Sequence, residues 1–134
     1  MGRKSNELFG GAVEGMDTYV FSTSLPPGPH KGVTVVGDDG IERLTELRAG
    51  DGKDIWLFGG GGLFGSLAAA GLVDGIEVAV MPVLLGGGIP VLSGSAGRVK
   101  LRLVSSEASA GGVLSLKYDV LQKPSASKGA TQPG

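Results

Sequence analysis

The stretch that decides the fold is KDIWLFGGGGLFGSL, Lys53 to Leu67, in which an apolar run leads through four consecutive glycines into a second apolar segment. The first run, Ile55 to Phe58, is short and continuous, as in strands that are covered on both faces. Gly59 to Gly62 have no Cβ, so a ligand can lie directly against their main chain. Apolar residues from Leu63 to Ala68 recur at helical spacing, which places a helix N-terminus beside the glycines. The pattern predicts a phosphate site, with a flexible surface loop as the alternative.

A dinucleotide-binding fingerprint, GxGxxG, can be aligned on Gly60, Gly62 and Gly65. That fingerprint requires an acidic residue about 20 positions further on, at the end of the next strand. The next expected strand is Ile76 to Met81, and Met81 to Val83 provide no acid there. We therefore interpret the glycines as a nucleotide phosphate turn of a different α/β fold.

Composition narrows the class of protein. A chain of 134 residues corresponds to one domain. A net charge of -1, from 12 basic and 13 acidic residues, indicates neither nucleic acid nor a membrane surface as partner. There is no cysteine, which excludes disulfides and thiolate metal sites and agrees with a cytoplasmic location. No apolar stretch is long enough for a membrane span, and MGRKSNEL lacks the apolar core of a signal peptide.

Apolar patterning and turn residues predict an α/β domain over residues 1–122 and a disordered tail over 123–134. Asp38 and Asp39 are candidates to cap the first predicted helix. A strand, helix and strand around the glycine turn imply a parallel, right-handed crossover, so we expect a mostly parallel sheet flanked by helices and closed by a hairpin. The expected elements are strands Thr18 to Ser22, Val33 to Val36, Ile55 to Phe58 and Ile76 to Met81, helices Ile41 to Arg48 and from the glycines to about Ala70, and a hairpin of Val99 to Glu107 with Val113 to Leu121.

Several motifs occur together in one order along the chain: MGRKS at Met1 to Ser5, YVFSTS at Tyr19 to Ser24, DIWLFGGGGLFGSL, and AAGLVDGIEVAVMPVLLGGGIPVL at Ala69 to Leu92. With the terminal hairpin they resemble the dihydrofolate-reductase-like superfamily. The closest resemblance is to the C-terminal reductase domain of the bacterial bifunctional riboflavin-biosynthesis deaminase/reductase and its stand-alone relatives. It covers nearly all of Met1 to Leu121.

The resemblance implies an NADPH-dependent reductase that transfers hydride to a small heterocyclic or ribosylamino-pyrimidine substrate, of the 5-amino-6-(5-phosphoribosylamino)uracil reductase type. Two alternatives remain. One is pterin reduction of the dihydrofolate reductase type, and the other is a non-catalytic nucleotide-binding or scaffold protein. We expect no metal site, and the resemblance allows a homodimer formed through the terminal hairpin.

The resemblance also implies which residues bind NADPH. Arg3 and Lys4 match the basic pair that meets the 2′-phosphate, and guanidinium and ammonium groups suit a phosphate on physical grounds. Ser5 matches a hydroxyl residue at the pyrophosphate. Ser22 and Thr23 match hydroxyls beside the adenosine phosphate. Gly59, Gly60 and Gly61 match the glycine turn, which often contains a cis peptide in the superfamily. Gly62, Leu63 and Phe64 match the start of the helix beneath the pyrophosphate and nicotinamide.

The largest departure from the superfamily lies at Met1. There the MGRK motif is internal and follows a strand, a helix and a second strand that hold much of the substrate pocket. We therefore expect Met1 to be an internal methionine of a longer frame and this chain to be the cofactor-binding half. Without a central strand beside them, the strands Ile55 to Phe58 and Ile76 to Met81 would expose unpaired backbone groups. The chain alone is then expected to be inactive and poorly stable.

Overall fold

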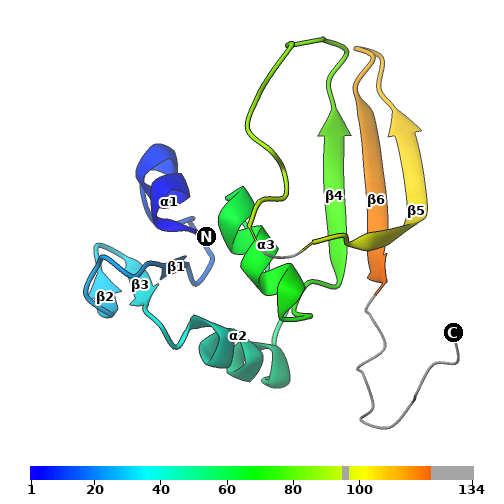
Figure 1. The fold of residues 1–134 in the computed structure, drawn as a ribbon. Helices are drawn as coiled ribbons and strands as arrows, with labels where there is room; N and C mark the ends of the chain where they lie inside the picture. Colours follow the sequence, from blue (N-terminus) through cyan, green and yellow to red (C-terminus); the bar gives the residue numbers. More distant parts are fainter. Residues whose placement is uncertain (95–96, 122–134) are drawn as a thin grey trace, which may run out of the picture. The chain divides into compact units, whose positions relative to one another are not determined.

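The computed structural model describes residues 1–94 and 97–121 and is mixed α/β, as expected (Figure 1). It contains two compact units, a first unit of Met1–Leu72 with Ile89–Ala96 and a second unit of Val73–Gly88 with Gly97–Gly134. The expected tail, 123–134, lies outside the described residues. The elements in chain order are α1 (Arg3–Phe9), β1 (Tyr19–Phe21), β2 (Gly28–His30), β3 (Val33–Val36), α2 (Gly40–Ala49), α3 (Gly61–Ala69), β4 (Gly75–Val80), β5 (Lys100–Ala108) and β6 (Leu114–Leu121).

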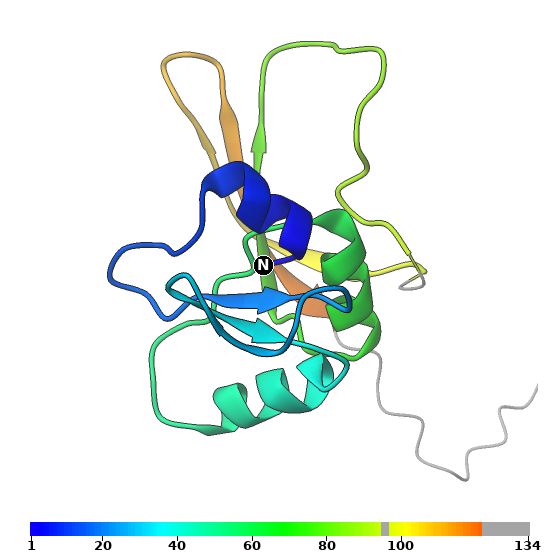
Figure 2. The same ribbon diagram turned by 90° about the vertical axis from the view of Figure 1, so that its left-hand side faces the viewer.

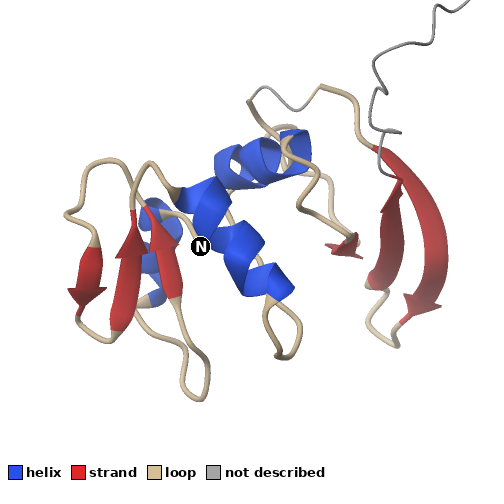
Figure 3. Ribbon diagram, turned by 90° about the horizontal axis from the view of Figure 1, so that it is seen from below, coloured by secondary structure: helices blue, strands red, loops and turns tan. Residues whose placement is uncertain are grey.

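A three-stranded sheet in the order β1-β3-β2 organises the first unit (Figure 3). β1 and β3 pair in parallel, with Tyr19 opposite Thr34 and Phe21 opposite Val36. β2 pairs antiparallel with β3, and it lies in the proline-rich segment between the first two strands that the sequence predicts. Pro29 is tolerated there because β2 is an edge strand, where a missing N–H leaves the ladder intact.

The first two residues continue the sheet beyond β1. Gly2 forms a parallel bridge with Phe21, whose N–H donates to the Met1 carbonyl oxygen at 2.9 Å. The Met1 ammonium donates to the Tyr19 carbonyl oxygen at 2.8 Å, and burial lowers its pKa. The Gly2 N–H donates to the Gly59 carbonyl oxygen at 3.1 Å. This short segment therefore connects β1 to the glycine turn.

The core of the first unit is built from β-branched strand residues and leucines from two helices. Val20 is fully buried at 0% exposure, and it clusters with Met1 and Val33. α2 follows β3 closely, and Figure 2 shows it below the strands of this sheet. Asp39 occupies the N-cap position of α2, but its side chain makes no capping hydrogen bond. The other buried apolar residues of this unit are Val35, Val36, Leu44 and Leu67.

The prediction that Ile55 to Phe58 forms a buried strand is wrong. The segment is not part of either sheet, and Ile55 and Trp56 are 51% and 67% exposed. A continuous apolar run becomes a buried strand only where neighbouring strands pair with it, and none of the described strands does so. Phe58 instead contacts Phe9 edge-to-face, with ring centroids 5.3 Å apart. α3 begins at Gly61, inside the glycine run.

A second three-stranded sheet, in the order β4-β6-β5, forms the second unit. The expected hairpin is confirmed as β5 and β6, with a register irregularity between Leu103 and Ser105. β4 pairs antiparallel with β6, and residues 55–58 form no strand, so the expected parallel crossover between Ile55 to Phe58 and β4 is wrong. Among the described strands one pair is parallel and three are antiparallel, which also corrects the expected mostly parallel sheet.

The sheet of the second unit has two different faces. Its register places Ile76 opposite Tyr118 and Tyr118 opposite Leu103, so apolar side chains share one face. The other face carries ion pairs, Lys117 to Glu77 at 3.0 Å and Arg102 to Asp119 at 2.6 Å. Within the described residues, no helix has the length and apolar character needed to cross a membrane.

Replacing Gly40, the first residue of α2, with alanine is expected to lower the melting temperature. Alanine normally stabilises a helix relative to glycine by about 0.5–1 kcal/mol. Here an added Cβ would lie 2.7 and 2.8 Å from two ring carbons of Phe21, closer than van der Waals contact allows. Thermal unfolding followed by circular dichroism measures the effect.

Gly50→Ala, at the other end of α2, is the matched control. Its added Cβ would meet the Leu47 carbonyl oxygen at 3.7 Å, an ordinary contact. We expect this variant to keep the melting temperature of the unsubstituted chain. Equal destabilisation by the two alanines would contradict the close packing of α2 on Phe21.

Candidate functional site

A cavity of about 690 Å³ lies at the carboxyl ends of β1 and β3 in the first unit. Its volume falls within the range of about 300–1,000 Å³ that is typical of small-molecule sites. Ligands of α/β folds commonly bind where parallel strands end. The wall is formed by the start of α1, the turn after β1, the connection from β3 to α2, and α3: Gly2, Arg3, Lys4, Ser5, Phe21, Ser22, Thr23, Ser24, Gly37, Asp38, Gly40, Ile41, Gly60, Leu63, Ser66 and Leu67.

The structure brings most of the expected site residues to this wall. Those that line it are Arg3, Lys4, Ser5, Ser22, Thr23, Gly60 and Leu63, and those that do not are Gly59, Gly61, Gly62 and Phe64. Three polar residues were missed by the sequence reasoning, namely Ser24, Asp38 and Ser66. Helical spacing from Leu63 was a signal for Ser66, because residues three apart share a helix face. For Ser24 and Asp38 the signal was their position two residues after the end of an expected strand.

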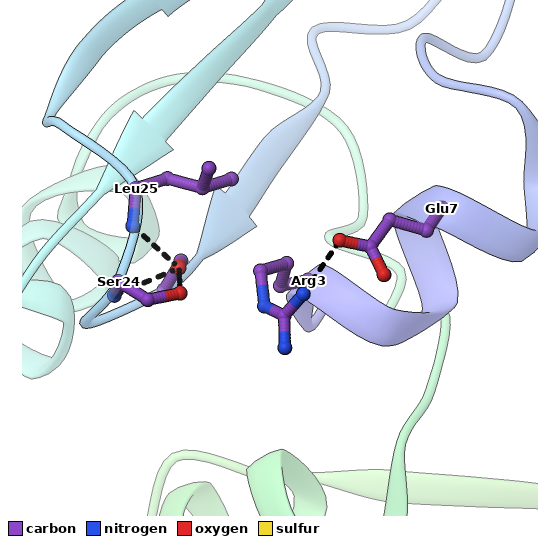
Figure 4. Close-up of polar contacts among 5 residues, drawn as sticks. Arg3, Glu7, Ser24 and Leu25 are labelled. Atoms are coloured by element: carbon purple, nitrogen blue, oxygen red, sulfur yellow. Dashed lines mark hydrogen bonds and ion pairs between the residues drawn. The ribbon is translucent and has the colours of Figure 1, made fainter.

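The turn after β1 is held by the Ser22 hydroxyl oxygen. It accepts from the Ser24 N–H at 3.2 Å and from the Leu25 N–H at 3.1 Å, and it lies 3.3 Å from the Ser24 hydroxyl (Figure 4). Serine often bends a chain in this way by hydrogen bonding to its own backbone. The Ser22 N–H donates to the Val36 carbonyl oxygen at 3.0 Å, which joins this turn to the end of β3. Ser22 thus positions Thr23 and Ser24 at the cavity wall.

Two cations enter the wall from the first turn of α1. The Arg3 guanidinium pairs with Glu7 one helical turn later, with Nη1 and Oε1 2.6 Å apart (Figure 4). Both side chains are partly exposed, at 38% and 56%, and pairs of this kind contribute about 0.3–0.5 kcal/mol. Arginine has five N–H donors, so an anion can bind the same guanidinium. Lys4 is exposed.

The glycine turn brings bare main chain to the cavity. The Gly59–Gly60 peptide is cis, as is often the case in the superfamily that the sequence resembles. Gly60 is the N-cap of α3, which has no side-chain cap and no acidic residue in its first turn. The first N–H groups of α3 are therefore not capped by a side chain, and the positive end of its dipole lies at the wall. A Cβ at Gly60 would meet only the Ser5 hydroxyl, at 3.7 Å.

Gly61 and Gly65, in α3, allow close packing and do not line the cavity. A Cβ at Gly61 would lie 2.7 Å from the Pro90 carbonyl oxygen, and one at Gly65 would overlap the Ser93 carbonyl oxygen. The Ser93 N–H also donates to the Gly61 carbonyl oxygen at 3.2 Å. These glycines let α3 pack closely against the segment that contains Pro90 and Ser93. In the part of the chain that is described, no group of three His, Asp or Glu residues is arranged to bind a metal.

The family follows from comparison with known proteins. The RibD C-terminal domain family matches residues 18–115. This chain belongs to that family. It is 31% identical over 133 residues to the uncharacterized protein YyaP of Bacillus subtilis, covering 87% of this chain and 70% of that protein.

Two further proteins are similar to this chain. The chain is 46% identical over 52 residues to the riboflavin biosynthesis protein RibD of Corynebacterium ammoniagenes, covering 39% of this chain and 15% of that protein. Its fold is similar to the crystal structure titled "Putative riboflavin biosynthesis protein" from Shewanella sp. PV-4, with a TM-score of 0.75 and 19% identity, covering 91% of this chain and 72% of that chain. This likeness confirms a mixed α/β fold similar to that of the riboflavin-biosynthesis protein.

Replacing Ser22 with alanine is expected to loosen the turn after β1. The N–H groups of Ser24 and Leu25 would lose their acceptor, and one such hydrogen bond contributes about 0.5–1.5 kcal/mol. Amide hydrogen exchange at these two residues should accelerate by about twofold to tenfold. Ser22→Thr retains the oxygen and should restore slow exchange. Unchanged exchange in the alanine variant would show that Ser22 does not hold the turn.

Proposed function

We propose that this chain is the cofactor-binding part of an NADPH-dependent reductase of the riboflavin-biosynthesis type. The observation that carries the proposal is the single cavity that joins Arg3 and Lys4 to the serine turn after β1 and to Gly60. Membership of the RibD C-terminal domain family supports it. The proposed substrate is a ribosylamino-pyrimidine or a related small heterocycle.

The residues of the cavity fit the chemistry of NADPH. The cofactor carries a pyrophosphate and a 2′-phosphate, and both require donors and positive charge. Arg3 and Lys4 would hold the 2′-phosphate, and Thr23 and Ser24 offer hydroxyl donors in the same cavity wall. Main chain at Gly60 and the uncapped start of α3 would meet the pyrophosphate, as helix N-termini commonly do.

The contribution of the chain to the reaction would be binding and orientation. NADPH, when bound, supplies a hydride. Leu63 and Leu67 give the cavity an apolar wall next to Gly60, which would exclude water from one side of the bound cofactor. Effective catalysis of this kind depends on holding two reactants in the right orientation.

A second candidate function is cofactor binding without turnover. Among the described residues that line the cavity, Asp38 is the single carboxylic acid, and no histidine lines it. A reductase needs a proton source as well as a hydride, so this wall favours a chain that binds NADPH and requires further residues for reduction. Titration with NADPH, followed by NADPH oxidation with a pyrimidine or a pterin substrate, separates these functions.

Arg3→Ala is expected to weaken NADPH binding by about tenfold or more, because a charge-assisted hydrogen bond is worth roughly 1.5–3 kcal/mol. NADH lacks the 2′-phosphate and should bind the variant almost as it binds the unsubstituted chain. Fluorescence titration with each cofactor gives the two dissociation constants. Lys53→Ala removes a positive charge outside the cavity and is the control. Equal weakening of both cofactors by Arg3→Ala would defeat the assignment.

Gly60→Val is expected to abolish cofactor binding, because its branched side chain would fill the space where the main chain meets the ligand. Gly52→Val serves as the control, because a Cβ at Gly52 meets nothing within 4 Å. Thermal unfolding establishes first that both variants fold. A folded Gly60→Val variant with normal NADPH affinity would show that the glycine turn is only a connection.

A further inference from the structure

One acidic side chain lies in the wall of the same cavity as two cations. Asp38 follows β3 after Gly37 and lines the cavity together with Arg3 and Lys4. Because β1 and β3 are parallel, the end of β3 lies beside the turn that follows β1. The hydrogen bond from the Ser22 N–H to the Val36 carbonyl oxygen holds the turn after β1 next to the end of β3. The cavity therefore combines hydrogen-bond donors that suit a phosphate with a carboxylate, which can only accept hydrogen bonds.

We propose that Asp38 is a specificity-determining residue that favours NADH and limits the preference for NADPH. The inference rests on the proposed function, since it concerns the cofactor of the same cavity. A carboxylate accepts hydrogen bonds and donates none. The adenosine ribose of NADH offers two neighbouring hydroxyl donors, whereas NADPH has a 2′-phosphate in place of one of them.

Asp38 shares one feature with the acid that makes such a discrimination in dinucleotide-binding folds, namely its place after the carboxyl end of a parallel strand. There an acidic residue at the carboxyl end of a strand accepts from the 2′-hydroxyl of NAD and disfavours the 2′-phosphate of NADP. In this chain the acid comes after β3, before the glycine turn in sequence, and not after the strand that follows the glycines. The parallel pairing of β1 with β3 brings it to the cavity.

The two positive charges at the start of α1 are closely balanced by negative charges. Glu7, which lies outside the cavity wall, pairs with Arg3 at 2.6 Å, and Asp38 is the carboxylate of the wall itself. Arg3 and Lys4 are thus matched by two acids, so the attraction for a 2′-phosphate is weaker than two cations alone would produce. Removing the charge of Asp38 should shift this balance toward NADPH.

Asp39 provides a matched control. It is adjacent to Asp38, is also exposed and occupies the N-cap of α2 without a side-chain capping hydrogen bond. It does not line the cavity. Asp39→Asn therefore removes the same charge from the same loop without touching the proposed ribose contact.

The experiment measures dissociation constants of NADPH and NADH for the full chain, for Asp38→Asn and for Asp39→Asn, from the fluorescence of the reduced nicotinamide. Exposed charge interactions of about 0.2–1 kcal/mol predict that Asp38→Asn binds NADPH up to about fivefold more tightly. NADH should bind more weakly by a comparable factor, so the ratio of the two constants changes by up to about 25-fold. The gain for NADPH should vanish near 1 M salt, where the Debye length is roughly 3 Å.

The outcomes separate this inference from the proposed function. If both cofactors bind and Asp38→Asn leaves their ratio unchanged, or if Asp39→Asn changes it equally, the role of Asp38 is wrong and the proposed function stands. If neither cofactor binds the unsubstituted chain, the proposed function and this inference fall together. A salt-independent gain would also overturn the role, because charge repulsion is screened by salt.

Discussion

The hydrogen bond from the Gly2 N–H to the Gly59 carbonyl oxygen, 3.1 Å long, is the contact on which the cavity depends. Gly2 also bridges to Phe21, and α1 begins at the next residue. One residue thus sets the position of the two cations of α1 relative to the serine turn and the glycine turn. The three parts of the wall come from distant parts of the chain, and this small segment holds them together.

Much of the local structure could be predicted from the sequence. α2 and the β5–β6 hairpin follow from periodicity and turn residues, which act between neighbours along the chain. The run Ile55 to Phe58 could not be assigned in this way, because a strand exists only through hydrogen bonds to another strand. Its apolar character indicates a buried environment, yet the structure leaves Trp56 67% exposed.

The residues of the candidate site that belong to recognisable sequence motifs could be predicted. Arg3, Lys4 and Gly60 were expected from the resemblance and do line the cavity. Asp38 was expected only as a helix cap, since its distance in sequence from the glycine turn gives no sign of proximity. The pairing of β1 with β3 creates that proximity, and such pairing is a property of the whole sheet. Whether these residues bind a nucleotide stays a prediction.

The turn held by Ser22 has a consequence for the way in which a ligand would associate with the cavity. Its backbone amides at Ser24 and Leu25 already have an acceptor, so the loop is ordered before any ligand arrives. Ordering a flexible loop on binding costs roughly 1–2 kcal/mol per residue in backbone entropy, and a prearranged turn avoids most of this. A ligand would then bind to a preorganised surface. Differences in affinity between ligands would arise mainly from their dissociation rates.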